Sequence, residues 1–528
     1  RPLHKNGAWT KDPIALSADC FLAARDKQIV WFDGQGNEAV LYTHAGEGLV
    51  HEPRPILPRL RERLITRRTN PRETAGKMFM ANVYEGRNLA GVKRGDIKKL
   101  LVLESLPKPV NFSGGPDLVS WLGTFTLERV LGTVPVEPDG SAYFEVPAGR
   151  QIFFEALDAQ DLSVKRMQSF TCAMPGEVVS CVGCHEPRAK TPEARPQPQF
   201  LALNRAPSRI EPFKDYPDVI DFTRDVQPIL DRRCVSCHSY EKREGKAIFC
   251  GDLGPQWSHS FFSLFAHQLV ADGRNGLGNQ PPRSIGSSAS RLLRLVDGSH
   301  YDTKVTPQEW RTLWLWIESG ATYAGTYAAL RNAQDQTKAG VANNRVFHEQ
   351  ASVLQRRCHS CHTAANADTA AAKPLPYYNY EARKRKARTE RPLGEYERIV
   401  FKDDPIARFS PDILLNFTRP QLSPLLLGPL AKTAGGFGSC GEVFKDTADP
   451  DYQLLLAAIR KGKADLDVQP RFSTPEFKPN PQYVRELKKY GILPSTFDLA
   501  KDNLNVFEAD QAYWRSLWHA GSAKAAAR

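Results

Sequence analysis

Three short segments of the chain repeat one pattern of cysteine and histidine. They are Cys181-Val182-Gly183-Cys184-His185, Cys234-Val235-Ser236-Cys237-His238 and Cys358-His359-Ser360-Cys361-His362. The spacing Cys-x-x-Cys-His is typical of c-type haem attachment, because two thiols add to the two vinyl groups of a porphyrin and the adjacent imidazole reaches the iron. We therefore predict three covalent c-type haems, with His185, His238 and His362 as proximal ligands.

Two other chemistries use closely spaced cysteines, and the pattern disfavours both. A thioredoxin-like redox pair needs one motif within a βαβ unit. A zinc site of four cysteines uses paired Cys-x-x-Cys segments without a histidine after each pair. The remaining cysteines are Cys20, Cys172, Cys250 and Cys440. They form disulfides if the compartment is oxidising, or they are buried free thiols, and the sequence leaves both alternatives open.

The second axial ligand of each iron determines its redox role. The four methionines, Met78, Met80, Met167 and Met174, all precede the first motif. For the second and third haems we therefore expect two histidine ligands or an open iron. His300 is our candidate for the distal ligand of the second haem, because it lies just before a Trp-rich helical segment, where small class-I-like cytochromes place their distal ligand.

Three further histidines are weaker distal candidates. His259 and His267 are eight residues apart, which places them near one face of a helix. His348 lies on the helix that leads to the third motif. His359, inside that motif, is interpreted as a solvent-facing loop residue.

The first haem differs from the others, because neither His nor Met occurs between His185 and His238. Met167, Met174 or Lys190 could still supply a distal ligand. We predict His185 as the proximal ligand and an open or weakly held sixth position.

The N-terminal part of the chain has strand patterns. Residues 1–60, with apolar runs at 21–24, 29–32 and 39–42 and a turn at 33–37, are interpreted as an incomplete β-propeller blade. Residues 52–72 are expected to be a linker. Residues 61–200 are predicted to form a small β-sandwich-like domain that ends in the first motif, with clear strands at 124–130, 142–146 and 151–156.

After a Pro-rich segment at 186–217, expected to be a linker, the pattern becomes helical. Thr223 is the expected cap of a short helix through residue 230, and Thr306 and Pro307 begin another that Gly320 ends. Trp310, Leu313, Trp314 and Ile317 share one face of it. Asn343 or Asn344 begins the helix before the third motif, and later helices are expected at 421–430, 450–461, 481–489 and 508–518. Residues 201–335 and 336–528 are predicted to be class-I-like cytochrome c units, so the fold class is α+β multidomain.

Composition excludes several classes of protein. An apolar fraction of 41% and a charged fraction of 25% are ordinary for globular protein, and no apolar run reaches the length of a membrane-spanning helix. The net charge of +12 fits acidic partners. The basic run 383–388 lies between acidic residues and carries no nucleic-acid motif, and the glycine-rich loop 435–438 lacks the Lys-Ser pair of a phosphate loop. The chain begins with Arg1 rather than Met, which indicates processing or truncation.

Two sets of residues resemble known families. Residues 131–144, 175–177 and 180–186 resemble the middle domain of hydrazine synthase alpha-subunit-like proteins, and residues 222–230 are similar to the cytochrome domains of planctomycete multihaem proteins. The resemblance covers most of the chain and implies partner subunits. In that family a Tyr four residues after the motif histidine binds the iron and that histidine binds zinc. Here the position is Ala189, which argues against synthase chemistry and indicates that His185 is an ordinary haem ligand.

These observations predict an exported triheme c-type cytochrome that transfers electrons between redox partner proteins. Covalent haem attachment places it in the periplasm or another extracytoplasmic compartment. The alternative is a haem oxidoreductase related to the hydrazine synthase alpha subunit, with chemistry at an open haem on Cys181 and Cys184. Other subunits of a complex are possible partners, whereas nucleic acid is not expected.

Overall fold

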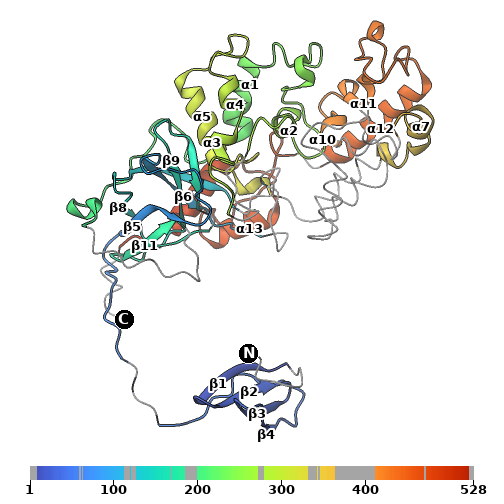
Figure 1. The fold of residues 1–528 in the computed structure, drawn as a ribbon. Helices are drawn as coiled ribbons and strands as arrows, with labels where there is room; N and C mark the ends of the chain where they lie inside the picture. Colours follow the sequence, from blue (N-terminus) through green and yellow to red (C-terminus); the bar gives the residue numbers. More distant parts are fainter. Residues whose placement is uncertain are drawn as a thin grey trace. The chain divides into compact units, whose positions relative to one another are not determined.

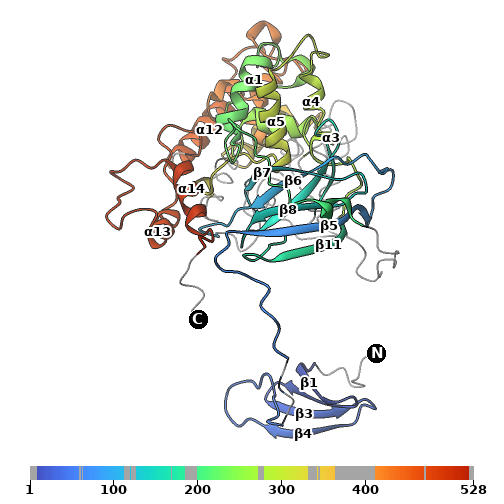
Figure 2. The same cartoon turned by 90° about the vertical axis from the view of Figure 1, so that its left-hand side faces the viewer.

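The chain divides into two compact units, Arg1–Arg67 and Arg68–Arg528, in the computed structural model shown from two directions in Figures 1 and 2. All three Cys-x-x-Cys-His motifs lie in the second unit. The structure describes residues 9–58, 61, 63–111, 119, 126–167, 169–184, 199–271, 279–330, 342, 345–362, 411–468 and 471–521.

The first unit is a four-stranded antiparallel sheet in the order β1 (Lys11–Ser17), β2 (Cys20–Arg25), β3 (Gln28–Asp33) and β4 (Glu38–Thr43). The three expected strands correspond to β2, β3 and β4. The sequence did not predict β1, because this strand is almost wholly exposed and lacks the apolar alternation of a half-buried strand. The buried core consists of Ala23, Val30 and Phe32.

The second unit begins with two sheets that enclose a common apolar cluster. The first sheet has the order β10-β9-β6-β7 and the second the order β11-β5-β8. Their bounds are β5 (Ala75–Gly86), β6 (Lys99–Ser105), β7 (Glu128–Pro135), β8 (Ala142–Pro147), β9 (Ile152–Leu157), β10 (Ser163–Arg166) and β11 (Val178–Cys184). Met78 and Phe144 from one sheet and Val102 and Phe154 from the other meet in this cluster. The region expected to be β is therefore β.

Part of the expected linker at 186–217 packs against this β region instead of running free. Residues 199–217 are described, and they begin with a short 3-10 helix, Leu201–Asn204. The backbone N–H of Ser208 donates to the carbonyl of Tyr143 at 2.9 Å, and the N–H of Glu211 donates to the carbonyl of Thr133 at 2.9 Å. The prolines conceal this pairing in the sequence because they break the alternation that a strand would show.

The rest of the second unit is helical. The α-helices are α1 (Gln227–Arg233), α2 (His259–Ala266), α3 (Gly286–Ala289), α4 (Leu292–Leu295), α5 (Pro307–Glu318), α7 (Ala351–Arg357), α10 (Pro411–Leu414), α11 (Pro424–Leu427), α12 (Pro450–Asp467), α13 (Pro481–Lys489) and α14 (Val506–Ser516). Short 3-10 helices cover Glu244–Lys246, Tyr327–Ala329, Pro420–Leu422 and Lys432–Ala434. The sheets and helices together confirm the α+β class.

Helix α5 begins and ends where the sequence predicted. Thr306 and Glu309 form a reciprocal capping box, and Pro307 occupies the first turn. The helix is buried on more than the expected face, however, because Leu315 and Trp316 are buried together with Leu313, Trp314 and Ile317. It lies between the sheet of β6, β7, β9 and β10 and the helices around α1 (Figure 2), so both of its sides are covered.

The start of the helix before the second motif differs from the prediction. A π-helical turn, Phe222–Val226, precedes α1, and Asp221 rather than Thr223 caps it. The carboxylate of Asp221 accepts the Arg224 N–H at 2.9 Å and the Gly325 N–H at 2.7 Å. A buried carboxylate is a stronger acceptor than a hydroxyl, and here it joins two distant segments.

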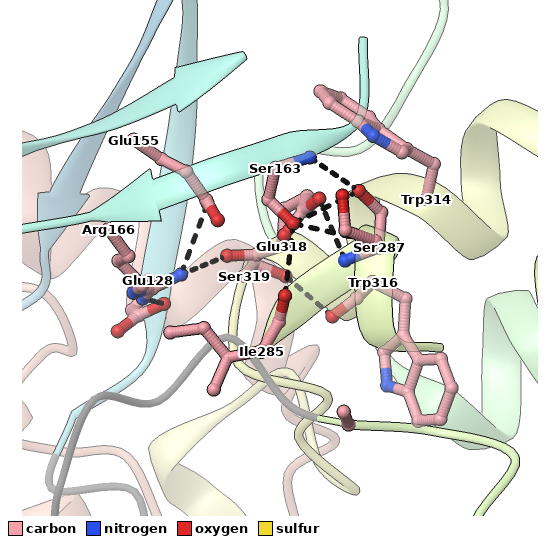
Figure 3. Close-up of polar contacts among 12 residues, drawn as sticks. Glu128, Glu155, Ser163, Arg166, Ile285, Ser287, Trp314, Trp316, Glu318 and Ser319 are labelled. Carbon is pink, nitrogen blue, oxygen red and sulfur yellow. Dashed lines mark hydrogen bonds and ion pairs between the residues drawn. The ribbon is translucent and has the colours of Figure 1, made fainter. Parts of the chain in front are cut away.

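A polar cluster connects the β region to α3 and α5 (Figure 3). The guanidinium of Arg166 donates to Glu128 at 2.5 Å and to the backbone carbonyl of Glu318 at 2.6 Å, and it lies 3.5 Å from a carboxyl oxygen of Glu155. The N–H of Ser287 donates to the Glu318 carboxyl at 3.0 Å. All of these side chains are buried or nearly so.

Two structural findings bear on the expected environment. The helices that the structure describes include none that is both long and apolar enough to cross a membrane. Cys20, Cys172, Cys250 and Cys440, all within the described ranges, form no disulfide in the structure. Of these four thiols Cys250 is buried, whereas Cys172 and Cys440 are exposed.

Candidate haem-binding sites

The second motif forms a tight turn at the end of α1. Cys234 is the C-cap of this helix, and its carbonyl accepts the N–H groups of Cys237 at 3.1 Å and of His238 at 2.9 Å. The turn therefore presents two thiols and an imidazole within one loop. This is the arrangement that the spacing of the motif predicts.

The imidazole of His238 is held in one tautomer. Its Nδ1 lies 2.8 Å from the backbone carbonyl of Glu244, and because a carbonyl can only accept, Nδ1 carries the hydrogen and donates it. Phe249 packs edge-on against the ring. Burial lowers the pKa of His238, and the neighbouring His300 lowers it further. The neutral imidazole thus keeps Nε2 available for a metal ion.

The ring of His300 lies close to the ring of His238. The two ring centres are 6.2 Å apart, and the ring planes differ by 13°. Two imidazole rings on opposite sides of one metal ion have their centres about 6 Å apart, because each metal–nitrogen bond is about 2 Å long and the ring centre lies about 1 Å beyond the nitrogen. The measured distance between the two ring centres therefore equals the separation that one iron ion between two histidines requires.

The loop that carries His300 has unusual backbone geometry. Tyr301 and Asp302, which follow His300, have φ values of 47° and 58°, a left-handed conformation that non-glycine residues rarely adopt. Such conformations cost about 1 kcal/mol or more each and persist where the surroundings determine them. This strain lies in the loop that brings His300 close to His238.

The two weaker candidates on α2 have different surroundings. His259 is fully buried, with Nε2 3.0 Å from the carbonyl of Leu415 and Nδ1 2.7 Å from the hydroxyl of Tyr240. Both of its nitrogens are engaged by the protein in this structure. His267 lies within electrostatic range of His238, and its Nε2 is buried without a hydrogen-bond partner among the described residues.

The third motif repeats the turn of the second at the end of α7. The carbonyl of Cys358 accepts the N–H groups of Cys361 at 3.2 Å and of His362 at 2.9 Å. His348 is exposed and precedes α7, so the length of that helix separates it from the motif. His359 is partly buried rather than fully solvent-facing. The expected helix caps Asn343 and Asn344 lie outside the described residues.

Both turns are joined to a second helix by a pair of arginines. Arg232 and Arg233 precede Cys234, and they bind the two carboxyl oxygens of Glu309 in the first turn of α5 at 3.1 and 2.9 Å. At the third motif Arg356 and Arg357 precede Cys358 and bind acidic residues at the start of α12, namely Asp449 and Asp451. We call these two sets of ion pairs the arginine clamps.

The first motif has a different structural context, because it lies on a strand. Cys181 and Cys184 belong to β11, which runs parallel to β5, with Cys181 opposite Met80 and Cys184 opposite Gly86. The register is irregular between Gly183 and Cys184, so the strand is distorted within the motif. His185, Ala189 and Lys190 lie outside the described residues.

Residues 95–186 match the family model of the hydrazine synthase alpha subunit middle domain. This part of the chain is therefore similar to the middle domain of a hydrazine synthase alpha subunit. The match includes the first motif and the segments on which the resemblance was based, and it confirms that resemblance over this range. Among solved structures, Kuenenia stuttgartiensis hydrazine synthase is similar at 17% identity and a TM-score of 0.46. That similarity covers 61% of this chain and 56% of the other, and no curated protein matches.

The middle domain places different side chains around its motif. Lys165 on β10 is buried, donates to the backbone carbonyls of Asn88 at 3.0 Å and of Gln280, and lies within electrostatic range of Cys184. Met174 is half exposed, and Met167 is partly buried against the apolar clusters. Met78 and Met80 are core residues between the two sheets of the β region.

Sequence reasoning missed the arginine clamps and Lys165. The clamps left a signal, because Arg-Arg stands directly before the first cysteine of both the second and the third motif. Their acidic partners carry no such signal, since they lie far along the chain and are brought close by the fold. Lys165 is one lysine among many in the sequence, and only its burial near Cys184 in the structure distinguishes it from the others.

Proposed function

We propose that this protein is an exported triheme c-type cytochrome that transfers electrons between redox partner proteins. The observation that carries the proposal is the close, nearly parallel pair of imidazole rings of His238 and His300. Cys234 and Cys237 would hold the second haem, and His238 and His300 would be its two axial ligands. The third haem would be held by Cys358, Cys361 and His362, and the first by Cys181, Cys184 and His185.

Two histidine ligands suit electron transfer better than catalysis. When bound, a haem supplies one-electron redox chemistry. With histidines on both sides, no axial position is left for a substrate. The chain's own contribution is to keep this geometry: the Glu244 carbonyl orients His238, the strained loop positions His300, and the arginine clamp holds the motif against α5.

The environment and partners follow from this proposal. Covalent haem attachment takes place outside the cytoplasm, so we infer a periplasmic or other extracytoplasmic location. The partners would be one-electron redox proteins, and the alpha-subunit-like middle domain supports assembly with further subunits. The sheet of the first unit would be one blade of a β-propeller, and the two helical regions would be class-I-like cytochrome c units.

A second function is favoured by one observation. The match to the hydrazine synthase alpha subunit middle domain includes Cys181 and Cys184. The first haem could therefore have an open sixth position and support oxidoreductase chemistry, with the other two haems delivering electrons. In this alternative the electron-transfer sites keep the same residues and roles.

The test is a haem count combined with site-directed removal of each motif. The denatured protein should keep its haem stain, and its pyridine haemochrome should correspond to three haems per chain. Replacing both cysteines of one motif by alanine should remove one haem, whereas Cys172→Ala should remove none. The reduced second haem should be low-spin. Two haems or fewer in the unaltered chain would refute the triheme proposal.

A further inference from the structure

Arg243 lies between the second and the third motif. The N–H of the next residue, Glu244, donates to the carbonyl of Cys237 at 3.1 Å, and the carbonyl of Glu244 accepts from His238. The backbone of Arg243 is left-handed, with a φ of 44°. This segment is therefore tied directly to the second motif.

The side chain of Arg243 reaches the loop at residues 437–439, near the third motif. Its guanidinium carbon lies 3.8 Å from the centre of the Phe437 ring, and Nη2 donates to the hydroxyl of Ser439 at 3.1 Å. Phe437 packs against the same apolar cluster as Cys358 of the third motif. Cys440, which follows Ser439, lies within electrostatic range of both Arg243 and Cys361.

The apolar clusters around the second and the third motif are in contact with each other. Val235, inside the second motif, packs against both clusters. Tyr240 and Ile248 belong to the apolar cluster around the third motif. Asn416 donates to the Tyr240 hydroxyl at 2.8 Å and to Asp252, whose carboxylate also accepts from Arg419 at 2.8 Å. Arg243 is therefore held in a constant position relative to both motifs.

The charge of Arg243 is not neutralised by an ion pair among the described residues. Within the part of the chain that the structure describes, no carboxylate forms an ion pair with its guanidinium, in contrast to the arginines of the clamps. A half-buried cation acts over a longer range than an exposed one, because less water screens it.

We propose that Arg243 is shared by the second and third haem sites and that its charge raises the reduction potentials of both. Reduction adds one negative charge to each site, so a fixed cation between the sites favours the reduced form of each. This inference rests on the proposed function, since it assumes haem at both motifs. It assigns the electrostatic coupling of the second and third haem sites to one side chain.

The test is a spectroelectrochemical titration of the full chain with its haems attached. Arg243→Ala should shift two of the three midpoint potentials to more negative values, and Arg243→Lys should largely restore them because the charge is kept. Lys242→Ala is the matched control, since it removes the same charge from the adjacent exposed residue. We expect it to shift the potentials less than Arg243→Ala does.

Three outcomes would overturn the inference: Arg243→Ala moves one potential or none, Lys242→Ala has the same effect, or Arg243→Lys does not restore the potentials. If Arg243→Ala attaches fewer haems than the unaltered chain, Phe437→Leu tests the same contact, because loss of the ring releases the guanidinium and should reduce its effect at both sites. The haem count separates this inference from the proposed function: a full count with one shifted potential refutes the role of Arg243 alone.

Discussion

At the scale of single residues, the histidines of the second unit are distinguished by what their ring nitrogens contact. His259 gives one nitrogen to Tyr240 and the other to Leu415, so it is a structural residue. His238 donates from Nδ1 to the carbonyl of Glu244, and its ring centre lies 6.2 Å from that of His300. Residue type alone does not separate these roles, because each role uses the same imidazole.

Replacing His300 with methionine tests its proposed role as distal ligand. His300→Met should leave the second haem attached and raise its reduction potential, because a thioether favours ferrous iron more than an imidazole does. The potential and the absorption spectrum of the reduced protein measure the change. His348→Met, at an exposed position, is the control and should alter neither. An unchanged spectrum and potential in His300→Met would refute the assignment.

Replacing His259 should have the opposite pattern of effects. His259→Leu leaves the Tyr240 hydroxyl and the Leu415 carbonyl without their buried partner, so the free energy of unfolding should fall by about 2 to 4 kcal/mol. The haem spectrum should stay the same. Denaturant titration measures the first quantity. A spectral change with unaltered stability would show that His259 binds haem after all.

At the scale of elements, the arginine clamps at the second and the third motif have the same arrangement of helices and ion pairs. Arginines in the last turn of one helix and acidic residues in the first turn of the next suit the two helix dipoles as well as each other. Burial alone would raise the pKa of Glu309, but the Thr306 N–H and then Arg233 and Arg232 hold that pKa below its ordinary value. The arginine clamp at the second motif therefore weakens only in acid.

Glu309→Gln tests this clamp while keeping the helix cap, since glutamine can also accept the Thr306 N–H. We expect a loss of about 1 kcal/mol in the free energy of unfolding, because the arginines are partly exposed. The loss should shrink as salt is added. Glu309→Ala removes the cap as well and should cost more. Equal stability of the glutamine variant and the unaltered protein would indicate that the ion pairs contribute nothing.

The joint between the β region and α5 has the opposite pH dependence (Figure 3). Burial is the main cause that raises the pKa of Glu155, and each of Glu155 and Glu318 is fully buried. Arg166 lowers both pKa values in part, while Glu128 adds to the rise at Glu155. Among the described residues no N–H or hydroxyl donates to the Glu155 carboxyl, so a proton shared between the two acids satisfies them.

Stability should therefore fall as the pH rises through the range in which the unfolded chain has lost this proton and the folded chain keeps it. That range begins near the ordinary glutamate value of 4.5. Glu155→Gln, which needs no proton, should flatten the dependence. Melting temperatures between about pH 5 and about pH 8 measure it. Glu137→Gln, in the partly exposed pair with Arg205, is the control and should keep the slope.

At the scale of the whole molecule, two motifs share one architecture and the first has another. The second and third motifs follow helices and are clamped by arginines, whereas the first lies on β11 in the middle domain. On this basis we propose a division of labour, in which the second and third sites pass electrons and the first has an open iron.

Carbon monoxide binding tests that division. The reduced protein should bind about one carbon monoxide per chain, because an iron with an open position binds it and an iron with two histidines resists. His185→Ala should abolish or alter the resulting band, whereas His362→Ala should leave it in place. No binding at all would refute an open first haem and leave electron transfer as the single proposal.

The sequence by itself determined the features that depend on neighbouring residues. The three haem motifs, the cap of α5 and the resemblance of the middle domain can all be read from contiguous segments, because covalent spacing and capping act over a few residues. The tertiary structure decided which distant groups meet. His238 faces His300, Arg232 and Arg233 meet Glu309, and Arg243 reaches Phe437, because packing brings together segments whose separation in the chain carries no signal of contact.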